Sequence, residues 1–567
     1  MFKFSFSKVS RQVEKPEDYP LITALNFGEL STAKEIQDQP IICSFCNSIL
    51  TNQSHLQKSG ENFTYKCEFC MKENSVSHDQ ALHLLKDGIE PESTDVSSME
   101  DMAFLLEEIR KDENNALSKM EMEKTTSGFP IQVAVIDVSG SMAGGKLEAV
   151  KHALVQNIHQ LTADFPATKF VLIPFSSDVR IYPTPEDQII VKDGPSFFKE
   201  SKLEKEIEKI VEKYPFQPIE KIYEGWTNVV KRMTDLNMTA LGPALFIGIQ
   251  SIIASQKSQA KKTGGKVILL TDGLANVGLG SIENSLGKDS KDAGFYSNIA
   301  KRCLENNIIV DMVGVREQGG GNSVALDVIG KVTDYTGGQM LFITADQVES
   351  AFGSFHRTNY IARNVVMRIY SPEFLVLEEI QGAEVLQSLD KIKRGDPIKL
   401  GAFYPDREIY LKFQQKDTKL PVGTKIPVQI QLEYLDTQGN RKMRINRQEI
   451  EIAPDMENFK KAYSPKIATA FELSKASKLR SKGDIKFAEA QVHQTMARNV
   501  SLGGQYDMDV SELNELVQDE MDEWKSEEAQ AVEQKISDKK SFYAAMGQSR
   551  SRSSYNAKLK RMRKKKK

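Results

Sequence analysis

The chain has 567 residues, of which 40% are hydrophobic and 27% are charged, and its formal net charge is −3. A chain of this length can bury roughly three or four hydrophobic cores of ordinary domain size. No apolar run approaches the roughly eighteen residues that a membrane span needs, and the first residues lack the apolar core of a signal peptide. Composition therefore argues against a membrane-spanning or secreted protein, and we expect a cytoplasmic protein, free or peripheral to membranes.

After an N-terminal extension at 1–35, the segment 36–80 carries four cysteines in two Cys-x-x-Cys pairs. Cys43 and Cys46 form the first pair, Cys67 and Cys70 form the second, and twenty residues separate them. This spacing lets two knuckles place four thiolates tetrahedrally about one structural Zn²⁺. Two disulfides are the alternative, but Cys-x-x-Cys spacing without a secretory segment favours metal. We therefore predict a zinc ribbon.

The next segment, 81–127, is rich in acidic residues and serine. It contains one amphipathic stretch at 99–109 whose pattern predicts a short helix. We expect an acidic linker that can dock through this helix.

A metal-site motif follows the linker. An apolar run ends at Asp137, and Ser139 and Ser141 follow it, so one turn offers a carboxylate and two hydroxyls, which are hard oxygen ligands for a small divalent cation. Thr239 and Asp272 offer two more oxygens, and Asp272 again comes directly after an apolar run. Each piece alone is typical of an ordinary turn. The three pieces in this order resemble the von Willebrand factor A (VWA) domain and its metal-ion-dependent adhesion site (MIDAS).

The resemblance implies a role for these five residues. They would hold Mg²⁺, or another divalent cation, and leave one coordination position open for a carboxylate from another protein. A site built largely from neutral hydroxyls compensates the charge of the ion poorly, so it should recruit an acidic partner.

The segment 128–360 alternates predicted strands and helices. Strands are predicted over 168–175, 266–270 and 308–315, and helices over 146–161, 244–254, 298–305 and into 336–338. An insertion at 183–220 has apolar residues at helical spacing, and we expect that face to pack on its own domain. This alternation predicts a doubly wound, Rossmann-like α/β fold whose ligand crevice lies at the carboxyl ends of the strands.

The pattern changes after residue 360. Alternating apolar and polar residues predict an antiparallel β-sandwich over 361–455, with strands at 364–370, 408–413, 428–434 and 443–445. A helical segment at 456–530 follows, with helices predicted over 467–480, 485–497 and 513–524. The chain thus combines an α/β domain with a ribbon, a sandwich and a helical segment.

The tail at 531–567 is strongly basic. Its last eighteen residues contain ten lysines and arginines and no acid, so the rest of the chain carries about −13. Such a tail is typical of a solubilising end, and it would also be attracted to an anionic membrane surface. The acidic body argues against a core that binds nucleic acid.

The order of ribbon, VWA-like trunk, β-sandwich and helical segment resembles the inner-coat proteins of COPII vesicles, which select cargo leaving the endoplasmic reticulum. The sharpest likeness is Tyr65-Lys-Cys67-Glu-Phe-Cys70, followed by Asn74. Two features depart from that family: its metal site is usually degenerate, whereas this one looks intact, and we expect no gelsolin-like module here.

Catalysis has little support in the sequence. No histidine lies beside a nucleophile motif, and the glycine run at 319–321 lacks the Lys-Ser/Thr that completes a P-loop. We therefore expect a non-enzymatic adaptor in vesicle transport, with a coat paralogue or small GTPase as further partner. The alternatives are a scaffold in a cytoskeletal or ciliary assembly and a module associated with a ubiquitin ligase.

Overall fold

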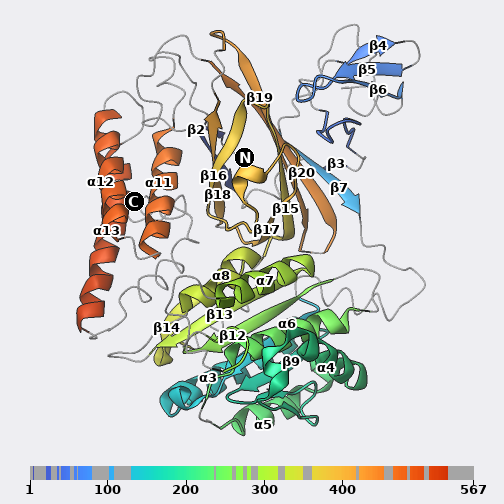
Figure 1. Ribbon diagram of the computed structural model, residues 1–567, viewed down its shortest axis with the longest axis vertical. Coiled ribbons are helices and arrows are strands. Elements are labelled where there is room, and N and C mark those ends of the chain that lie inside the picture. The colour runs from blue at the N-terminus through green and yellow to red at the C-terminus, as the bar shows by residue number, and fades with distance from the viewer. Residues whose placement is uncertain are drawn as a thin grey trace.

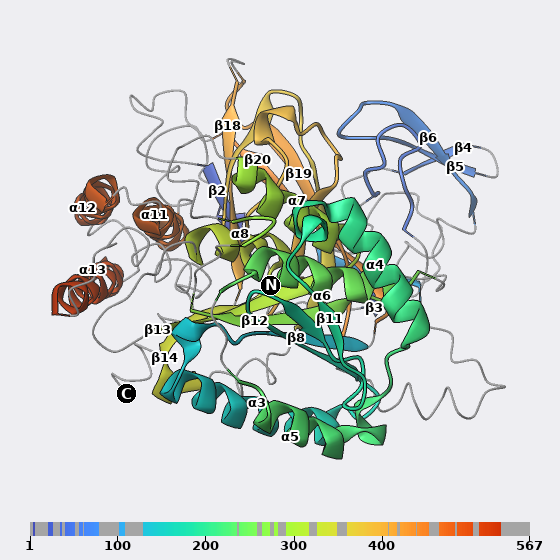
Figure 2. The ribbon, with the colours of Figure 1, turned by 60° about the horizontal axis from the view of Figure 1, so that its bottom comes forward.

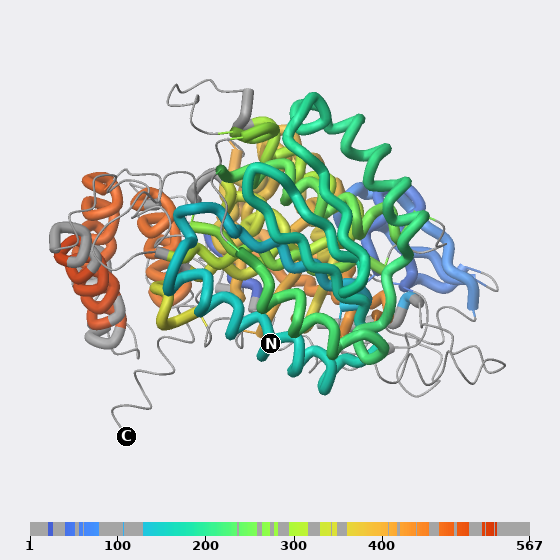
Figure 3. The backbone as a smooth tube through the Cα atoms, turned by 90° about the horizontal axis from the view of Figure 1, so that it is seen from below, coloured from blue at the N-terminus to red at the C-terminus, as the bar shows by residue number. Residues whose placement is uncertain are grey.

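The computed structural model describes residues 4–5, 21–26, 35–36, 40–50, 56–59, 62–78, 101–107, 129–234, 238–257, 263–272, 277–281, 291–316, 326–348, 360–405, 407–416, 420–437, 439–452, 464–481, 485–502 and 510–533. The glycine run, the basic tail beyond 533 and most of the linker lie outside these residues. Figure 1 shows an α/β trunk at the bottom, a β-sandwich above it, and the ribbon and the C-terminal helices on opposite sides. Seen from below, the ribbon and the helices again lie on opposite sides (Figure 3).

The trunk is built on a seven-stranded sheet with the order β11-β10-β9-β8-β12-β13-β14. Its strands are β8 (Ile131–Asp137), β9 (Lys169–Phe175), β10 (Val179–Ile181), β11 (Ile189–Val191), β12 (Gly265–Thr271), β13 (Ile308–Arg316) and β14 (Met340–Thr344). The central pairings are parallel, and β10 and β11 are antiparallel at one edge. Every residue of β8 and β12 is buried, as expected for parallel strands covered on both faces. The predicted fold class is confirmed.

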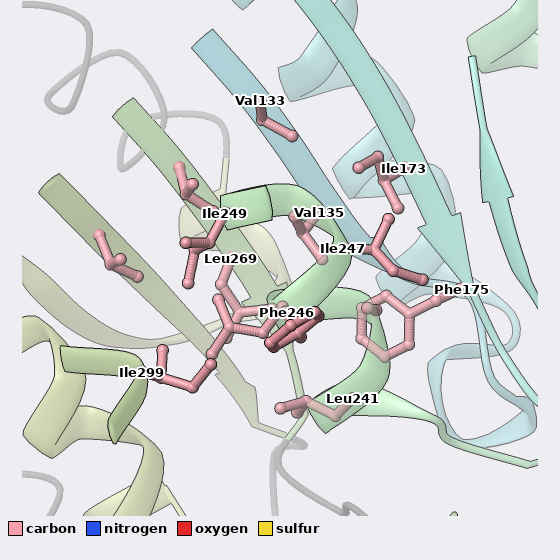
Figure 4. Close-up of a cluster of buried hydrophobic side chains, with 14 of the residues drawn as sticks. Val133, Val135, Ile173, Phe175, Leu241, Phe246, Ile247, Ile249, Leu269 and Ile299 are labelled. Carbon is pink, nitrogen blue, oxygen red and sulfur yellow. The ribbon is translucent and has the colours of Figure 1, made fainter. Parts of the chain in front are cut away.

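Helices cover both faces of this sheet (Figure 2). They are α3 (Gly145–Asp164) and α5 (Tyr223–Lys231) on one face, and α4 (Glu200–Lys213), α6 (Leu241–Ser255), α7 (Lys291–Glu305) and α8 (Leu326–Thr336) on the other. Alternate residues of β8 serve the two layers, so that Val133 and Val135 pack with α6 (Figure 4), whereas Ala134 and Ile136 pack with α3. Gly248 lets α6 approach closely, because a Cβ there would lie 2.8 Å from Val135.

The predicted helix of the insertion is confirmed as α4. Its apolar residues Leu203, Ile207 and Val211 are buried in the same hydrophobic cluster as α6. The insertion therefore packs on its own domain, as the helical spacing indicated.

The sandwich has a four-stranded sheet, β1-β2-β18-β16, and a six-stranded sheet, β17-β15-β19-β20-β7-β3. The predicted strands are confirmed as β15 (Ala362–Tyr370), β18 (Glu408–Gln415), β19 (Lys425–Leu435) and β20 (Arg441–Glu451), and β16 (Leu375–Gln381) and β17 (Ile398–Phe403) join them. The sandwich is not confined to 361–455, however. β1 (Phe4–Ser5), β2 (Leu21–Asn26) and β3 (Glu35–Ile36) come from the N-terminal part of the chain.

The helix predicted over 99–109 is wrong. Residues Asp101–Glu107 form strand β7, which pairs antiparallel with β20 and parallel with β3. The edge of β20 offers a row of backbone partners more than 300 residues away in sequence, and this pairing overrides a local helical pattern. The linker is therefore partly built into the sandwich.

The ribbon forms a small sheet that packs on the sandwich. Its strands are β4 (Gln57–Ser59), β5 (Asn62–Lys66) and β6 (Glu73–Val76). Gln429 of β19 accepts a hydrogen bond from the Ile49 N–H at 2.9 Å and donates one to its carbonyl at 2.8 Å. Arg447 of β20 pairs with Glu68 at 2.6 Å. Because these contacts involve both strands of one hairpin, they fix the orientation of the ribbon.

The three predicted C-terminal helices are confirmed as α11 (Pro465–Ser481), α12 (Ile485–Leu502) and α13 (Val510–Glu533). Phe471 of α11 packs with Ile22 of β2 and Tyr410 of β18 in one buried cluster, so the helices cover the outer face of the four-stranded sheet. None of the described helices is long and apolar enough to cross a bilayer.

The trunk and sandwich meet around a buried ion pair near the amino ends of β12 and β13. Lys266 lies 2.6 Å from Asp311, and their side chains are 4% and 0% exposed. The Tyr360 hydroxyl and the Gln339 N–H both donate to Asp311. At the same junction Gly337 has φ +75° and lies so close to β17 that a Cβ would be 2.2 Å from the Ala402 carbonyl oxygen.

We expect Asp311→Ala to lower the free energy of unfolding of the trunk by about 3–5 kcal/mol, because it leaves the Lys266 charge buried without its partner. Urea unfolding followed by Trp226 fluorescence, in a Trp524→Phe background, measures this. Glu208→Ala, which removes an exposed pair with Lys257, is the matched control and should change stability by less than about 1 kcal/mol. Equal effects of the two substitutions would contradict the assigned role of the buried pair.

Candidate functional site

The carboxyl edge of the trunk sheet brings together side chains from two neighbouring strands. β8 ends at Asp137, and β12 ends at Thr271, directly before Asp272. The two strands are parallel, with Leu270 beside Ile136. The carboxylates therefore emerge next to each other, at the edge where open α/β sheets bind ligands.

Hydrogen bonds connect four of the five predicted site residues. The Ser139 N–H donates to Asp137 Oδ1 at 2.8 Å. The Ser139 and Ser141 hydroxyls are 3.0 Å apart, and Ser141 Oγ donates to Asp272 Oδ1 at 2.9 Å. The structure thus places these residues within one small cluster, and their role as metal ligands stays a prediction.

Thr239, the fifth predicted residue, is held at the same edge by backbone contacts. It lies just before α6 and is 3% exposed. The N–H of the next residue, Ala240, donates to the carbonyl of Ser176 at 2.7 Å, and the Val277 N–H donates to the carbonyl of Thr239 at 3.3 Å. Ser176 directly follows β9, the strand on the other side of β8.

Sequence reasoning missed three residues at this edge. Thr271 Oγ1 donates to Asp137 Oδ2 at 2.6 Å, and Lys146 Nζ lies 3.3 Å from Asp272 Oδ2. Ser176 carries a buried hydroxyl without a hydrogen-bond partner in this structure. A threonine before the second aspartate and a lysine one turn after the serines were visible in the sequence, but only the fold gives them partners.

The environment of Asp137 opposes its ionisation. Complete burial and, to a lesser degree, the nearby charge of Asp272 raise the pKa of Asp137 to about 7, against the opposing hydrogen bonds from Ser139 and Thr271. A divalent cation would relieve both effects at once.

The residues present fit a hard divalent cation. The cluster offers two carboxylates and the hydroxyls of Ser139 and Ser141, and the unpartnered Ser176 hydroxyl lies at the same edge. Mg²⁺ prefers oxygen ligands and commonly keeps several waters. No thiol or imidazole is among these side chains, so the donor set favours Mg²⁺ over Zn²⁺.

The raised pKa of Asp137 predicts a pH-dependent stability in the metal-free protein. The folded state keeps a proton that the unfolded chain releases near pH 4, so the free energy of unfolding should fall as the pH rises from about 4 to about 7. Asp137→Asn lacks this titration. In EDTA, its melting temperature relative to wild type should therefore be higher at pH 8 than at pH 5. A difference that is the same at both pH values would count against the protonated Asp137.

The second candidate site is the four-cysteine cluster of the ribbon. Cys43 and Cys70 have their sulfurs 3.6 Å apart, as do Cys46 and Cys67, and all four lie within 4.8 Å of one another. Tetrahedral Zn–S bonds of about 2.3 Å imply S···S distances of about 3.8 Å. The sulfurs are too far apart for disulfides, which require about 2.05 Å, and the arrangement can hold a zinc ion with no open coordination position.

Hydrogen bonds within the ribbon favour a thiolate at Cys43, whereas burial raises the pKa of Cys46 and of Cys70. Burial raises the pKa of Cys43, but backbone N–H groups of Phe45 and Cys46 and the side chain of Asn74 outweigh it and lower the pKa to about 7. Asn74 donates to the Cys43 sulfur at 3.4 Å and also accepts from the Ser44 N–H. Such second contacts orient a metal ligand and stabilise its deprotonated form.

We expect the purified protein to carry about one zinc per chain, and Cys67→Ser to lose it, because three thiolates leave the tetrahedral site incomplete. Elemental analysis measures the zinc, and limited proteolysis should show new cleavage within residues 40–78. Cys303→Ala, which alters a buried thiol in the trunk, is the control and should retain the metal. A zinc-free wild-type protein with a protected ribbon would refute the zinc prediction.

Comparison with known proteins gives a consistent picture. Residues 129–357 match the Sec23/Sec24 trunk domain. The chain is 27% identical over 460 residues to Circularly permutated Ras protein 1 of Dictyostelium discoideum. This alignment covers 76% of this chain and 50% of that protein. The chain is 27% identical over 238 residues to Protein transport protein SEC24-2 of Naumovozyma castellii, which covers 37% of this chain and 24% of that protein.

The fold extends this similarity over most of the chain. The crystal structure of the human COPII-coat protein Sec24c superposes with a TM-score of 0.64 and 14% identity, covering 88% of this chain and 68% of that chain. The chain spans half or less of the two curated relatives named above. Its trunk is similar to the Sec23/Sec24 trunk domain, and the fold of most of the chain resembles that of a COPII-coat protein.

Proposed function

We propose that this chain, which has a Sec23/Sec24-type trunk, is a non-enzymatic adaptor. It binds an acidic partner through Mg²⁺ held by the intact side-chain cluster at the carboxyl edge of the trunk sheet. The observation that carries the proposal is the convergence of Asp137, Ser139, Ser141 and Asp272 at the carboxyl edge of the trunk sheet. In the proposed site these side chains and Thr239 hold the ion. The ion supplies a positive charge that a carboxylate of the partner can approach.

The chemistry of the site supports binding rather than catalysis. Among the described residues, Ser139 and Ser141 hydrogen-bond to each other and to aspartates and not to a histidine, so they lack the histidine base that commonly activates a catalytic serine. The ribbon offers four thiolates and no open position, which supports a structural role for zinc.

Vesicle transport is the cellular role that the architecture supports best. The trunk matches the Sec23/Sec24 trunk domain, and the fold resembles that of a COPII-coat protein. The ribbon docks on the sandwich through Gln429 and Arg447, so these parts form one coat-like body. We place the protein on the cytosolic face of membranes between the endoplasmic reticulum and the Golgi, where the basic tail can meet anionic lipid.

A small GTPase is the further partner that we propose. The support is the similarity to Circularly permutated Ras protein 1. This chain matches half of that protein, which is named for Ras, a small GTPase. A coat paralogue is the second candidate, because the body resembles a coat subunit.

We expect Asp137→Ala to abolish Mg²⁺-dependent capture of acidic partners, because it removes a buried carboxylate from the proposed ion site. Affinity purification from lysate in Mg²⁺ and in EDTA, followed by mass spectrometry, measures the capture. Asp193→Ala, which changes an exposed aspartate of the trunk, is the matched control and should behave as wild type. Equal partner recovery in EDTA and in Mg²⁺ would refute the metal-dependent function.

Cell fractionation separates the adaptor from a fixed scaffold. An adaptor of the coat type should move to membranes when GTP-loaded small GTPases accumulate and should leave them in high salt. Retention in a salt-resistant particulate fraction, with no response to GTP, would favour the cytoskeletal or ciliary scaffold instead.

A further inference from the structure

Lys146 brings its own positive charge to the candidate metal site. It lies in the first turn of α3, five residues after Ser141. Its Nζ donates to the Ser141 carbonyl oxygen at 3.0 Å and to Asp272 Oδ2 at 3.3 Å. The side chains of Lys146 and Asp272 are only 11% and 8% exposed. The pair is therefore largely withdrawn from solvent, unlike an ordinary surface ion pair.

The contacts of Lys146 overlap with those a metal would make. Asp272 gives one oxygen to Ser141 Oγ and the other to Lys146, and Ser141 binds Lys146 through its carbonyl. Both oxygens of a predicted ligand are thus engaged by the chain itself. A divalent cation near Asp272 must repel the ammonium group or displace it.

We propose that Lys146 is an internal counter-cation that competes with Mg²⁺ for Asp272 and stabilises the site when no metal is bound. This inference rests on the proposed Mg²⁺ site and adds its regulation: the trunk remains folded without metal, and occupancy follows the Mg²⁺ concentration instead of being permanent. With both carboxylates ionised, the two aspartates and Lys146 carry a net charge of −1 before the ion binds and +1 afterwards. The loaded site is therefore cationic, which suits an acidic partner.

The alternative is that Lys146 only supports the local fold. If Lys146 is purely structural, its substitution lowers the stability of the protein in every buffer and leaves the Mg²⁺ affinity unchanged. If Lys146 is a counter-cation, removing its charge lowers the stability of the metal-free protein but strengthens Mg²⁺ binding. Opposite effects on stability and affinity distinguish the two roles.

Lys146→Gln is the main test, because glutamine can still donate hydrogen bonds to Ser141 and Asp272 without the charge. Mg²⁺ alone is titrated by calorimetry into full-length wild type and variant after EDTA treatment. We expect the dissociation constant for Mg²⁺ to fall at least about tenfold, since a unit charge a few ångströms from a divalent ion is strongly repulsive in a partly buried site. The melting temperature should be below that of wild type in EDTA and should recover in saturating Mg²⁺.

Two further variants complete the test. Lys146→Arg keeps the charge and should retain the weak Mg²⁺ binding of wild type. Lys151→Met, on the same helix, removes a lysine that pairs with Glu148 instead of the site and should leave Mg²⁺ affinity unchanged. If Lys146→Gln does not fold, Lys146→Met supplies the neutral comparison.

The outcomes separate this inference from the function on which it rests. Unchanged Mg²⁺ affinity in the neutral variants overturns the role of Lys146 and leaves the metal site standing. Failure of wild type and every variant to bind Mg²⁺ at millimolar concentration overturns both. Tighter binding with lower metal-free stability supports the counter-cation.

Discussion

The parallel pairing of β8 with β12 is the constraint on which the candidate site depends. It places the end of one buried strand beside the end of the other, so that Asp137 and Asp272 emerge together although 135 positions separate them. Two carboxylates brought together in a buried place are unfavourable unless cations or hydrogen bonds compensate them. Ser139, Thr271 and Lys146 provide that compensation here, Thr271 from β12 itself and the other two from the turn and the helix that follow β8.

The two ends of β12 lie at two different sites of the trunk. Near its amino end, Lys266 pairs with Asp311 at the junction with the sandwich. At its carboxyl end, Asp272 pairs with Lys146 at the candidate site. A seven-residue strand separates these ends by about 20 Å. The junction with the sandwich and the edge that we propose to bind a partner therefore lie at opposite ends of this strand.

Much of the fold was predictable because it follows from local patterns. Apolar runs such as Ile131–Asp137 and the amphipathic patterns of helices can be recognised without tertiary information. The strand at Asp101–Glu107 was not predictable in this way, because its partner, β20, lies far away in the chain. The same limit applies to Lys146, whose local pattern shows only an ordinary helical lysine.

The sequence by itself determined which chemical groups are available: four cysteines at zinc-ribbon spacing, and oxygens at the ends of apolar runs. Those are properties of residue type and short spacing. Only the tertiary structure decided which groups face one another, namely Lys146 with Asp272, Thr271 with Asp137 and the N-terminal strands with the sandwich. Long-range pairing decides these contacts, because a charged or hydrogen-bonding side chain takes its partner from whatever the packed sheet places within about 3 Å of it.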